Sequence, residues 1–131
     1  MKGEMTGDGE RQCSGREVAA LSSSSGCMVG QIANVATFRL AVGGTGRMPC
    51  PLAVAASMPA SITGARLAKR ALVFDGCPAR YAMRTLERAG ISPTNHVIVT
   101  DVGLKNVDDL GHEPSNVDRV VELCLNALSG K

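Results

Sequence analysis

Aromatic residues are nearly absent from this sequence. It has no tryptophan, one tyrosine and two phenylalanines among 131 residues. Proteins that bind single-stranded nucleic acid stack the bases on aromatic side chains, and this chain has no set of that kind. The formal net charge of +2 is also too small to indicate a nucleic-acid partner. We therefore expect no nucleic-acid partner, and we expect a core built from Ala, Val, Leu, Ile and Met.

Long apolar runs are also missing. No stretch of about 20 apolar residues occurs, so the sequence predicts no transmembrane helix and no membrane partner. Residues 1–12 are polar and lack the apolar segment of a signal peptide. We therefore expect a cytoplasmic protein. Its five cysteines are then expected to be reduced, metal-bound or reactive, because disulfides are rare in that compartment.

The length of the chain suits one domain with one modest core. Residues 1–12 show no hydrophobic periodicity and are predicted to form a flexible N-terminal arm. Residues 13–131 are predicted to form a single α/β domain. No internal repeat and no second domain are visible in the sequence.

Strand-like and helix-like segments alternate along the chain. Short apolar or β-branched runs predict strands at residues 16–21, 71–74 and 96–102, and residues 47–52 are expected to form a short edge strand or an extended loop. Apolar residues at helical spacing predict helices after Cys27, after Met58, over residues 78–89 and after Ser115. This order predicts an α/β fold: a small, doubly wound, mostly parallel sheet of about four strands with helices on both faces.

The segment Ala71–Pro78 joins a buried strand to a helix. Four apolar residues are followed by Asp75, Gly76, Cys77 and Pro78. Because proline is favoured at the first helical position, Pro78 is predicted to begin the helix. Cys77 is then expected at or beside the helix N-cap, at the carboxyl end of a strand, where ligands bind in open α/β sheets.

Three cysteines follow the ends of expected strands: Cys27, Cys50 and Cys77. Because these strand ends share one edge of a parallel sheet, we expect the three thiols to converge. Thiolates around one point favour a soft metal, so zinc is the predicted cofactor, with protein or water in the fourth position. Cys124 lies on an apolar helical face and is expected to be a small buried hydrophobe, and Cys13 a surface thiol.

Other metal-ligating residues are few. The sequence has no CxxC pair, and His96 and His112 are its only histidines. His96 begins an expected strand, away from the carboxyl edge of the sheet, and His112 lies in an expected loop. Both are expected to be structural or exposed.

Two alternatives to a metal site stay open. Cys27 or Cys77, each expected at a helix N-terminus, suits a nucleophilic thiolate in an enzyme or in a sulfur or redox relay. The small-residue loop of Ser24, Ser25 and Gly26 leads from a strand into a helix and suits a small anion. A homodimer is also plausible, because the edge of a small sheet needs protection.

Four sequence blocks occur together and in a fixed order. They are Val29-Gly30-Gln31, Gly46-Arg47-Met48-Pro49-Cys50, Phe74-Asp75-Gly76-Cys77-Pro78 and Val99-Thr100-Asp101-Val102-Gly103. Between about residues 22 and 106 the chain therefore resembles the DGC-domain family, which is named after its Asp-Gly-Cys motif. That family is regarded as zinc-binding because of four cysteines, so the resemblance implies a zinc site.

The resemblance carries over two of those four cysteines directly, Cys50 and Cys77. The family's first cysteine corresponds to Ser23, with Cys27 four residues later, and its remaining cysteine corresponds to Tyr81. If zinc binds, the resemblance implies an open site, which suits catalysis, sensing or metal transfer. The implied ligands are Cys27, Cys50, Cys77 and Asp75, with water or an exogenous ligand as the alternative to Asp75.

Overall fold

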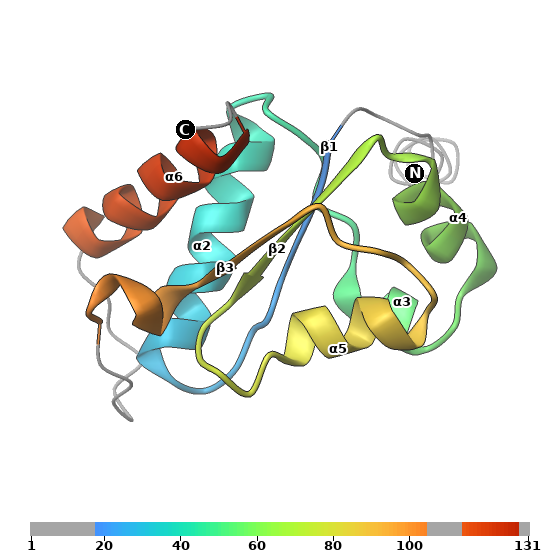
Figure 1. The fold of residues 1–131 in the computed structure, drawn as a ribbon, viewed down its shortest axis with the longest axis horizontal. Helices are drawn as coiled ribbons and strands as arrows, with labels where there is room; N and C mark the ends of the chain where they lie inside the picture. The colour runs from blue at the N-terminus through green and yellow to red at the C-terminus, as the bar shows by residue number, and fades with distance from the viewer. Residues whose placement is uncertain (1–17, 105–113, 129–131) are drawn as a thin grey trace, which may run out of the picture.

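The computed structural model describes residues 18–104 and 114–128. Within these ranges the chain forms a mixed α/β fold, in which one parallel sheet is packed between helices (Figure 1). No helix in the described ranges is long and apolar enough to cross a membrane. The predicted N-terminal arm at residues 1–12 lies outside them.

The sheet has three strands in the described residues. They are β1 (Val18–Ser22), β2 (Arg70–Asp75) and β3 (Asn95–Ile98), in the order β1-β2-β3 with both pairs parallel. The prediction of about four strands is not confirmed, because residues 47–52 contribute only one bridge, at Arg47 beside Ala19. Pro49 and Pro51 cannot donate a hydrogen bond to a neighbouring strand, so pairing stops there.

Helices lie on both sides of the three-stranded sheet (Figure 1). The predicted doubly wound layout of about four strands is not confirmed. The helices are α2 (Met28–Val42), α3 (Pro51–Ala55), α4 (Pro59–Leu67), α5 (Tyr81–Arg88) and α6 (Pro114–Leu128). Successive residues of β2 point to opposite faces: Leu72 and Phe74 join the core cluster that includes α2 and α6, and Val73 joins the cluster that includes α3, α4 and α5.

Two element boundaries differ from those predicted. Helix α5 begins at Tyr81 and not at Pro78, because Arg80 adopts a left-handed conformation (φ 55°) that no helix can include. Cys77 therefore lies three residues before the N-cap residue Arg80. The last predicted strand is also shorter, since β3 ends at Ile98 and residues Val99–Val102 form the 3₁₀ helix η1.

The loop after β2 packs tightly against the first turn of α2. A Cβ atom built on Gly76 would lie 2.7 Å from the backbone nitrogen of Gly30 and 2.8 Å from the carbonyl carbon of Val29. Backbone atoms cannot rotate away as a side chain can. Glycine at position 76 is therefore required for the two segments to meet.

Replacing this glycine should destabilise the protein. We expect Gly76→Ala to lower the free energy of unfolding by about 1–3 kcal/mol, the usual range for overpacking. Gly26→Ala is the matched control, because nothing lies within 4 Å of its Cβ position, and it should change stability by less than about 0.5 kcal/mol. Urea denaturation of both variants measures the difference, and equal stabilities would show that the close contact is absent.

Candidate functional site

The carboxylate of Asp75 lies at the carboxyl end of β2 and is almost fully buried, at 1% exposure. Its Oδ1 atom accepts the N–H of Ala82 at 2.8 Å and its Oδ2 atom accepts the N–H of Met83 at 3.2 Å. These are the second and third N–H groups of α5, which lack partners within the helix. Asp75 therefore does for α5 what an N-cap side chain does, although it comes from the preceding strand.

The second oxygen of Asp75 also binds His96. The Nε2 atom of His96 lies 2.7 Å from Asp75 Oδ2, and both side chains are shielded from solvent. The expectation that His96 lies away from the carboxyl edge was therefore wrong. In the parallel register His96 is opposite Val73, two residues before Asp75 in β2, so the two side chains share a face of the sheet and can reach each other diagonally.

The serine-rich loop after β1 contacts the loop after β2. The hydroxyl of Ser23 accepts the N–H of Gly76 at 3.1 Å, and the Ser23 side chain is largely buried. The hydroxyl of Ser25 lies 3.0 Å from the Sγ atom of Cys27, and the Ser25 carbonyl accepts from the Gln31 side chain at 2.7 Å. The loop that was predicted to cradle an anion thus makes internal hydrogen bonds at Ser25, while Ser24 and Gly26 are exposed.

The three predicted metal-binding thiols lie on two sides of the sheet. Cys27, the N-cap residue of α2, and Cys77 are partly buried against the core cluster on the α2 and α6 side. Cys50, the N-cap residue of α3, is exposed on the opposite side. None of the three is in a disulfide. This separation follows from the chain path, because α2 and α3 cover opposite faces.

The side chains do not fit a closed zinc site. In residues 18–104 and 114–128, no three His, Cys, Asp or Glu side chains are grouped so that they could hold a metal ion. The predicted set of Cys27, Cys50, Cys77 and Asp75 is therefore not assembled here. The carboxylate of Asp75 is already engaged by two backbone N–H groups and His96. Zinc binding stays a prediction.

A hollow of about 360 Å³ lies at the carboxyl end of β1, between α3 and α5. Its polar lining consists of hydroxyl groups, one amide and one thiol, and its apolar lining comes from the facing sides of the two helices. We call this the thiol hollow. It is lined by Ser22, Ser23, Ser24, Asn34, Cys50, Pro51, Leu52, Ala55, Tyr81, Ala82 and Thr85.

The fold and the hollow together define a small parallel α/β protein with a thiol-bearing pocket at the carboxyl ends of its strands. Comparison with known proteins identifies the family to which the chain belongs. The sequence profile of the DGC domain matches residues 19–124. The chain belongs to the DGC-domain family, as its sequence blocks predicted.

One curated relative is the anaerobic and virulence modulator AnvM of Pseudomonas aeruginosa. It is 34% identical to this chain over 82 residues, which is 62% of this chain and 63% of the relative. The match therefore spans less than two thirds of that protein. No solved structure matches the chain.

The family's cysteine positions can now be located. Ser23, Cys50 and Tyr81 all line the thiol hollow, and Ser23 is hydrogen-bonded to the residue before Cys77. The sequence pattern placed Ser23 and Cys50 in separate loops and Tyr81 in a helix. The structure brings the three to one hollow, where two carry a hydroxyl at positions for which the resemblance implies a thiol. Ser23 and Tyr81 were not among the predicted site residues, because the predicted metal ligands were thiols and a carboxylate and the predicted anion loop began at Ser24.

Removing the buried carboxylate should destabilise the protein strongly. Asp75→Ala leaves two N–H groups of α5 and His96 without their partner, and we expect a loss of about 3 kcal/mol. Asp118→Ala is the control, because Asp118 pairs with Arg39 on the surface and should lose less than about 1 kcal/mol. Thermal and urea unfolding measure both variants. Similar losses for the two would contradict the role assigned to Asp75.

The fourth described cysteine should be chemically inert in the folded state. Cys124 is fully buried on α6, and burial raises the pKa of its thiol to about 12. Iodoacetamide at pH 8 should alkylate Cys50 but modify Cys124 only after unfolding. Modification of Cys124 in the native protein would contradict its burial.

The raised pKa of Cys124 should also make the stability of the protein depend on pH. Above the ordinary thiol pKa near 9 the unfolded chain loses the Cys124 proton and the folded chain keeps it. The free energy of unfolding should therefore fall as the pH rises from 9 towards 12.

Proposed function

We propose that this DGC-domain protein binds a small polar ligand in the thiol hollow, through the thiol of Cys50 and the surrounding hydroxyl groups. The observation that carries the proposal is the hollow itself, which gathers Ser23 from the loop after β1, Cys50 from the N-cap of α3 and Tyr81 from the start of α5. Its volume of about 360 Å³ lies within the usual range for small-molecule sites, roughly 300–1,000 Å³.

The chemistry of the lining favours a polar molecule over a tightly held metal. Serine and tyrosine hydroxyls each donate one hydrogen bond and accept others, and the Asn34 amide can do both. Structural zinc is held by thiolates and imidazoles. With hydroxyls at positions 23 and 81, the hollow itself has Cys50 as its only thiol among the residues that line it.

A bound zinc ion is the second candidate. It is favoured by family membership, by the positions of Cys27 and Cys77 after β1 and β2, and by Cys50, which lines the thiol hollow. Their side chains are not grouped in the present arrangement. A zinc ion would therefore require these loops to rearrange, and it would be held by fewer thiolates than the family pattern offers.

A nucleophilic role for Cys27 or Cys77 gains less support. The Sγ atom of Cys27 contacts the hydroxyl of Ser25, and no hydrogen bond joins either thiol to a histidine in the described part of the chain. His96 is bound to Asp75. A nucleophilic thiol is usually activated by an adjacent base or by a lowered pKa.

The name of the relative suggests a biological role. AnvM is described as a modulator, and ligand binding that regulates other processes agrees with that description better than a catalysed reaction does. Because the match covers 63% of the relative, a regulatory role for this chain is part of the proposal. The cytoplasmic location and the homodimer stay predictions.

Restoring the family's cysteines should convert the hollow into a zinc site. Protein purified without added zinc should contain well below one equivalent by elemental analysis. The Ser23→Cys, Tyr81→Cys double variant should approach one equivalent, because it returns thiols to the two positions that line the hollow with Cys50.

The matched control adds the same number of thiols in a different arrangement. Ser24 also lines the hollow but is not a family cysteine position, so the Ser24→Cys, Tyr81→Cys variant should gain less zinc. One full equivalent in the unmodified protein, lost in Cys50→Ser, would establish the zinc candidate and overturn the small-ligand proposal. Equal zinc contents in the two double variants would show that positions 23, 50 and 81 do not form one site.

A further inference from the structure

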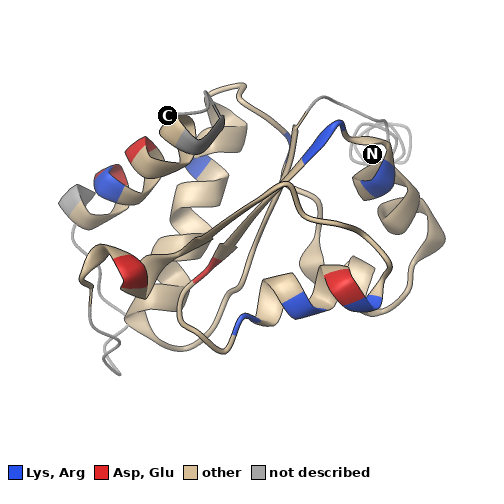
Figure 2. Ribbon diagram, viewed as in Figure 1, with Lys and Arg blue, Asp and Glu red and all other residues tan. Residues whose placement is uncertain are grey.

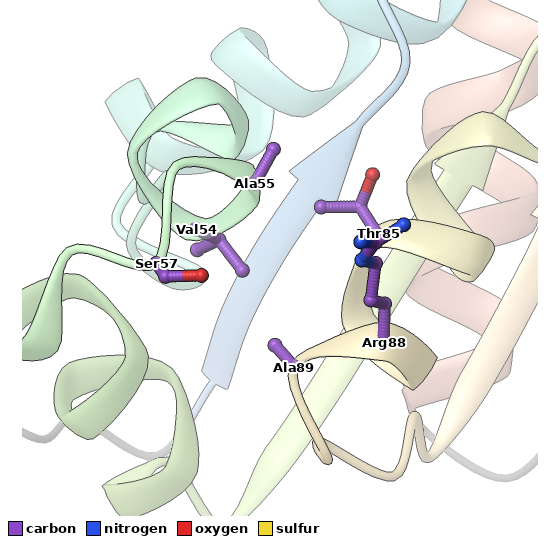
Figure 3. Close-up of a pocket in the computed structure, with 6 residues that line it drawn as sticks. All are labelled: Val54, Ala55, Ser57, Thr85, Arg88 and Ala89. Carbon is purple, nitrogen blue, oxygen red and sulfur yellow. The ribbon is translucent and has the colours of Figure 1, made fainter.

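A second hollow adjoins the thiol hollow between α3 and α5. Its volume is about 270 Å³, and Figure 3 shows its lining side chains facing one another from the two helices. Ala55 and Thr85 line both hollows, so the two adjoin at these residues, and we call the pair the groove. We call the second part the arginine hollow. It is lined by Val54, Ala55, Ser57, Thr85, Arg88 and Ala89.

The guanidinium of Arg88 is available for a ligand. No ion pair or hydrogen bond of its side chain occurs within the described ranges, and the residue is exposed. Thr85 lies one turn before Arg88 in α5, and both line the arginine hollow (Figure 3). Because Thr85 also lines the thiol hollow, Arg88 lies within about one helical turn of the boundary between the two hollows.

Helix capping does not account for Arg88. A cation in the last turn of a helix can serve the unpaired carbonyl groups there. In α5, however, Ile91 N–H donates to the Leu86 carbonyl at 2.9 Å and Gly90 N–H donates to the Glu87 carbonyl at 3.0 Å. Arg66 donates to the Ala89 carbonyl at 2.9 Å. The carbonyl groups of Leu86, Glu87 and Ala89 therefore have hydrogen-bond partners that do not involve the Arg88 side chain.

The electrostatic surroundings of the groove favour an anion. Arg84 and Arg88 lie four residues apart in α5, whose one acidic residue is Glu87, and the N-cap residue Arg80 precedes Arg84 by the same spacing. Figure 2 shows the basic positions along this helix. Of the described residues that line either hollow, none is an Asp or a Glu. Ser57 adds a hydroxyl on the α3 side, opposite Arg88 (Figure 3). A guanidinium with a nearby hydroxyl donor suits a carboxylate.

We propose that the groove binds an elongated small organic acid, with its carboxylate at Arg88 and its other end beside Cys50. This inference rests on the proposed function, because it assigns the ligand class of the same site. The apolar side chains of Val54 and Ala55 would contact the middle of the molecule. Specificity would come from the distance between the charged end and the polar end of the groove.

Alkylating reagents of graded length test this assignment. The probes are N-iodoacetyl glycine, N-iodoacetyl β-alanine and N-iodoacetyl 6-aminohexanoic acid, each compared with its own primary amide. In each reaction the Cys50 sulfur forms a bond to carbon, iodide leaves, and the thiol proton goes to the buffer. Peptide mass spectrometry gives the rate at Cys50 for every reagent.

At one of the three reagent lengths, the reagent with the free carboxylate should alkylate Cys50 about two- to fivefold faster than the corresponding amide does. A preference of this size is in the range expected for an exposed ion pair. Arg88→Gln should abolish that preference and leave the rates of the amides unchanged. Arg84→Gln is the matched control, since it removes the same charge from α5 at a residue that lines neither hollow, and it should keep the preference.

Three outcomes would overturn the inference: no preference at any chain length, an equal loss of preference in Arg84→Gln and Arg88→Gln, or no reaction of Cys50 with the neutral amides. The second would show that the general charge of α5 attracts the acid. Failure of the proposed function appears separately, as a full zinc equivalent in the unmodified protein, because zinc content does not depend on Arg88.

Discussion

The buried carboxylate of Asp75 is the interaction on which the arrangement of the site depends. A carboxylate removed from water is unfavourable unless hydrogen bonds compensate it. Here two N–H groups of α5 and the ring of His96 do so. One side chain at the end of β2 thereby fixes the start of α5 and links it to β3. Because Tyr81 is the first residue of α5, the same contact sets where one wall of the thiol hollow begins.

The three residues of the Asp-Gly-Cys motif therefore have different roles. Asp75 anchors α5, and Gly76 allows a backbone contact with α2 that a Cβ atom would prevent. Gly76 also donates to Ser23, which ties the loop after β1 to the loop after β2. Two of the three residues thus hold the loops in place, and Cys77 makes neither of these contacts. Loss of a family thiol at positions 23 and 81 can leave this framework intact.

The sequence was sufficient for the parts of the fold that depend on local pattern. The apolar run before Asp75 and the helical spacing after Cys27 predicted β2 and α2, and the four blocks predicted the family. The errors arose where a distant contact decides. Proline favours the first helical position, yet the helix starts at Tyr81, where the carboxylate of Asp75 meets its N–H groups.

The position of the thiols shows the same limitation. Their common location after strand ends predicted convergence, but Cys27 precedes a helix on one face of the sheet and Cys50 a helix on the other. Which face a helix covers depends on the crossover and not on the loop sequence. The parallel register of His96 beside Val73 could have indicated the contact with Asp75, but that register is itself known only from the structure.

The two walls of the groove are held differently, and this difference constrains how a ligand can act. Helix α5 is secured at its start by Asp75 and at its end by Arg66 and the turn at Gly90. Helix α3 has five residues, and its N-cap residue Cys50 makes no side-chain capping hydrogen bond. Its Ala53 and Val54 N–H groups donate to the Cys50 carbonyl, and Val54 packs in the core. A ligand in the groove would therefore contact one wall that a buried carboxylate ties to the sheet and another that begins at Cys50 and is held by the packing of Val54.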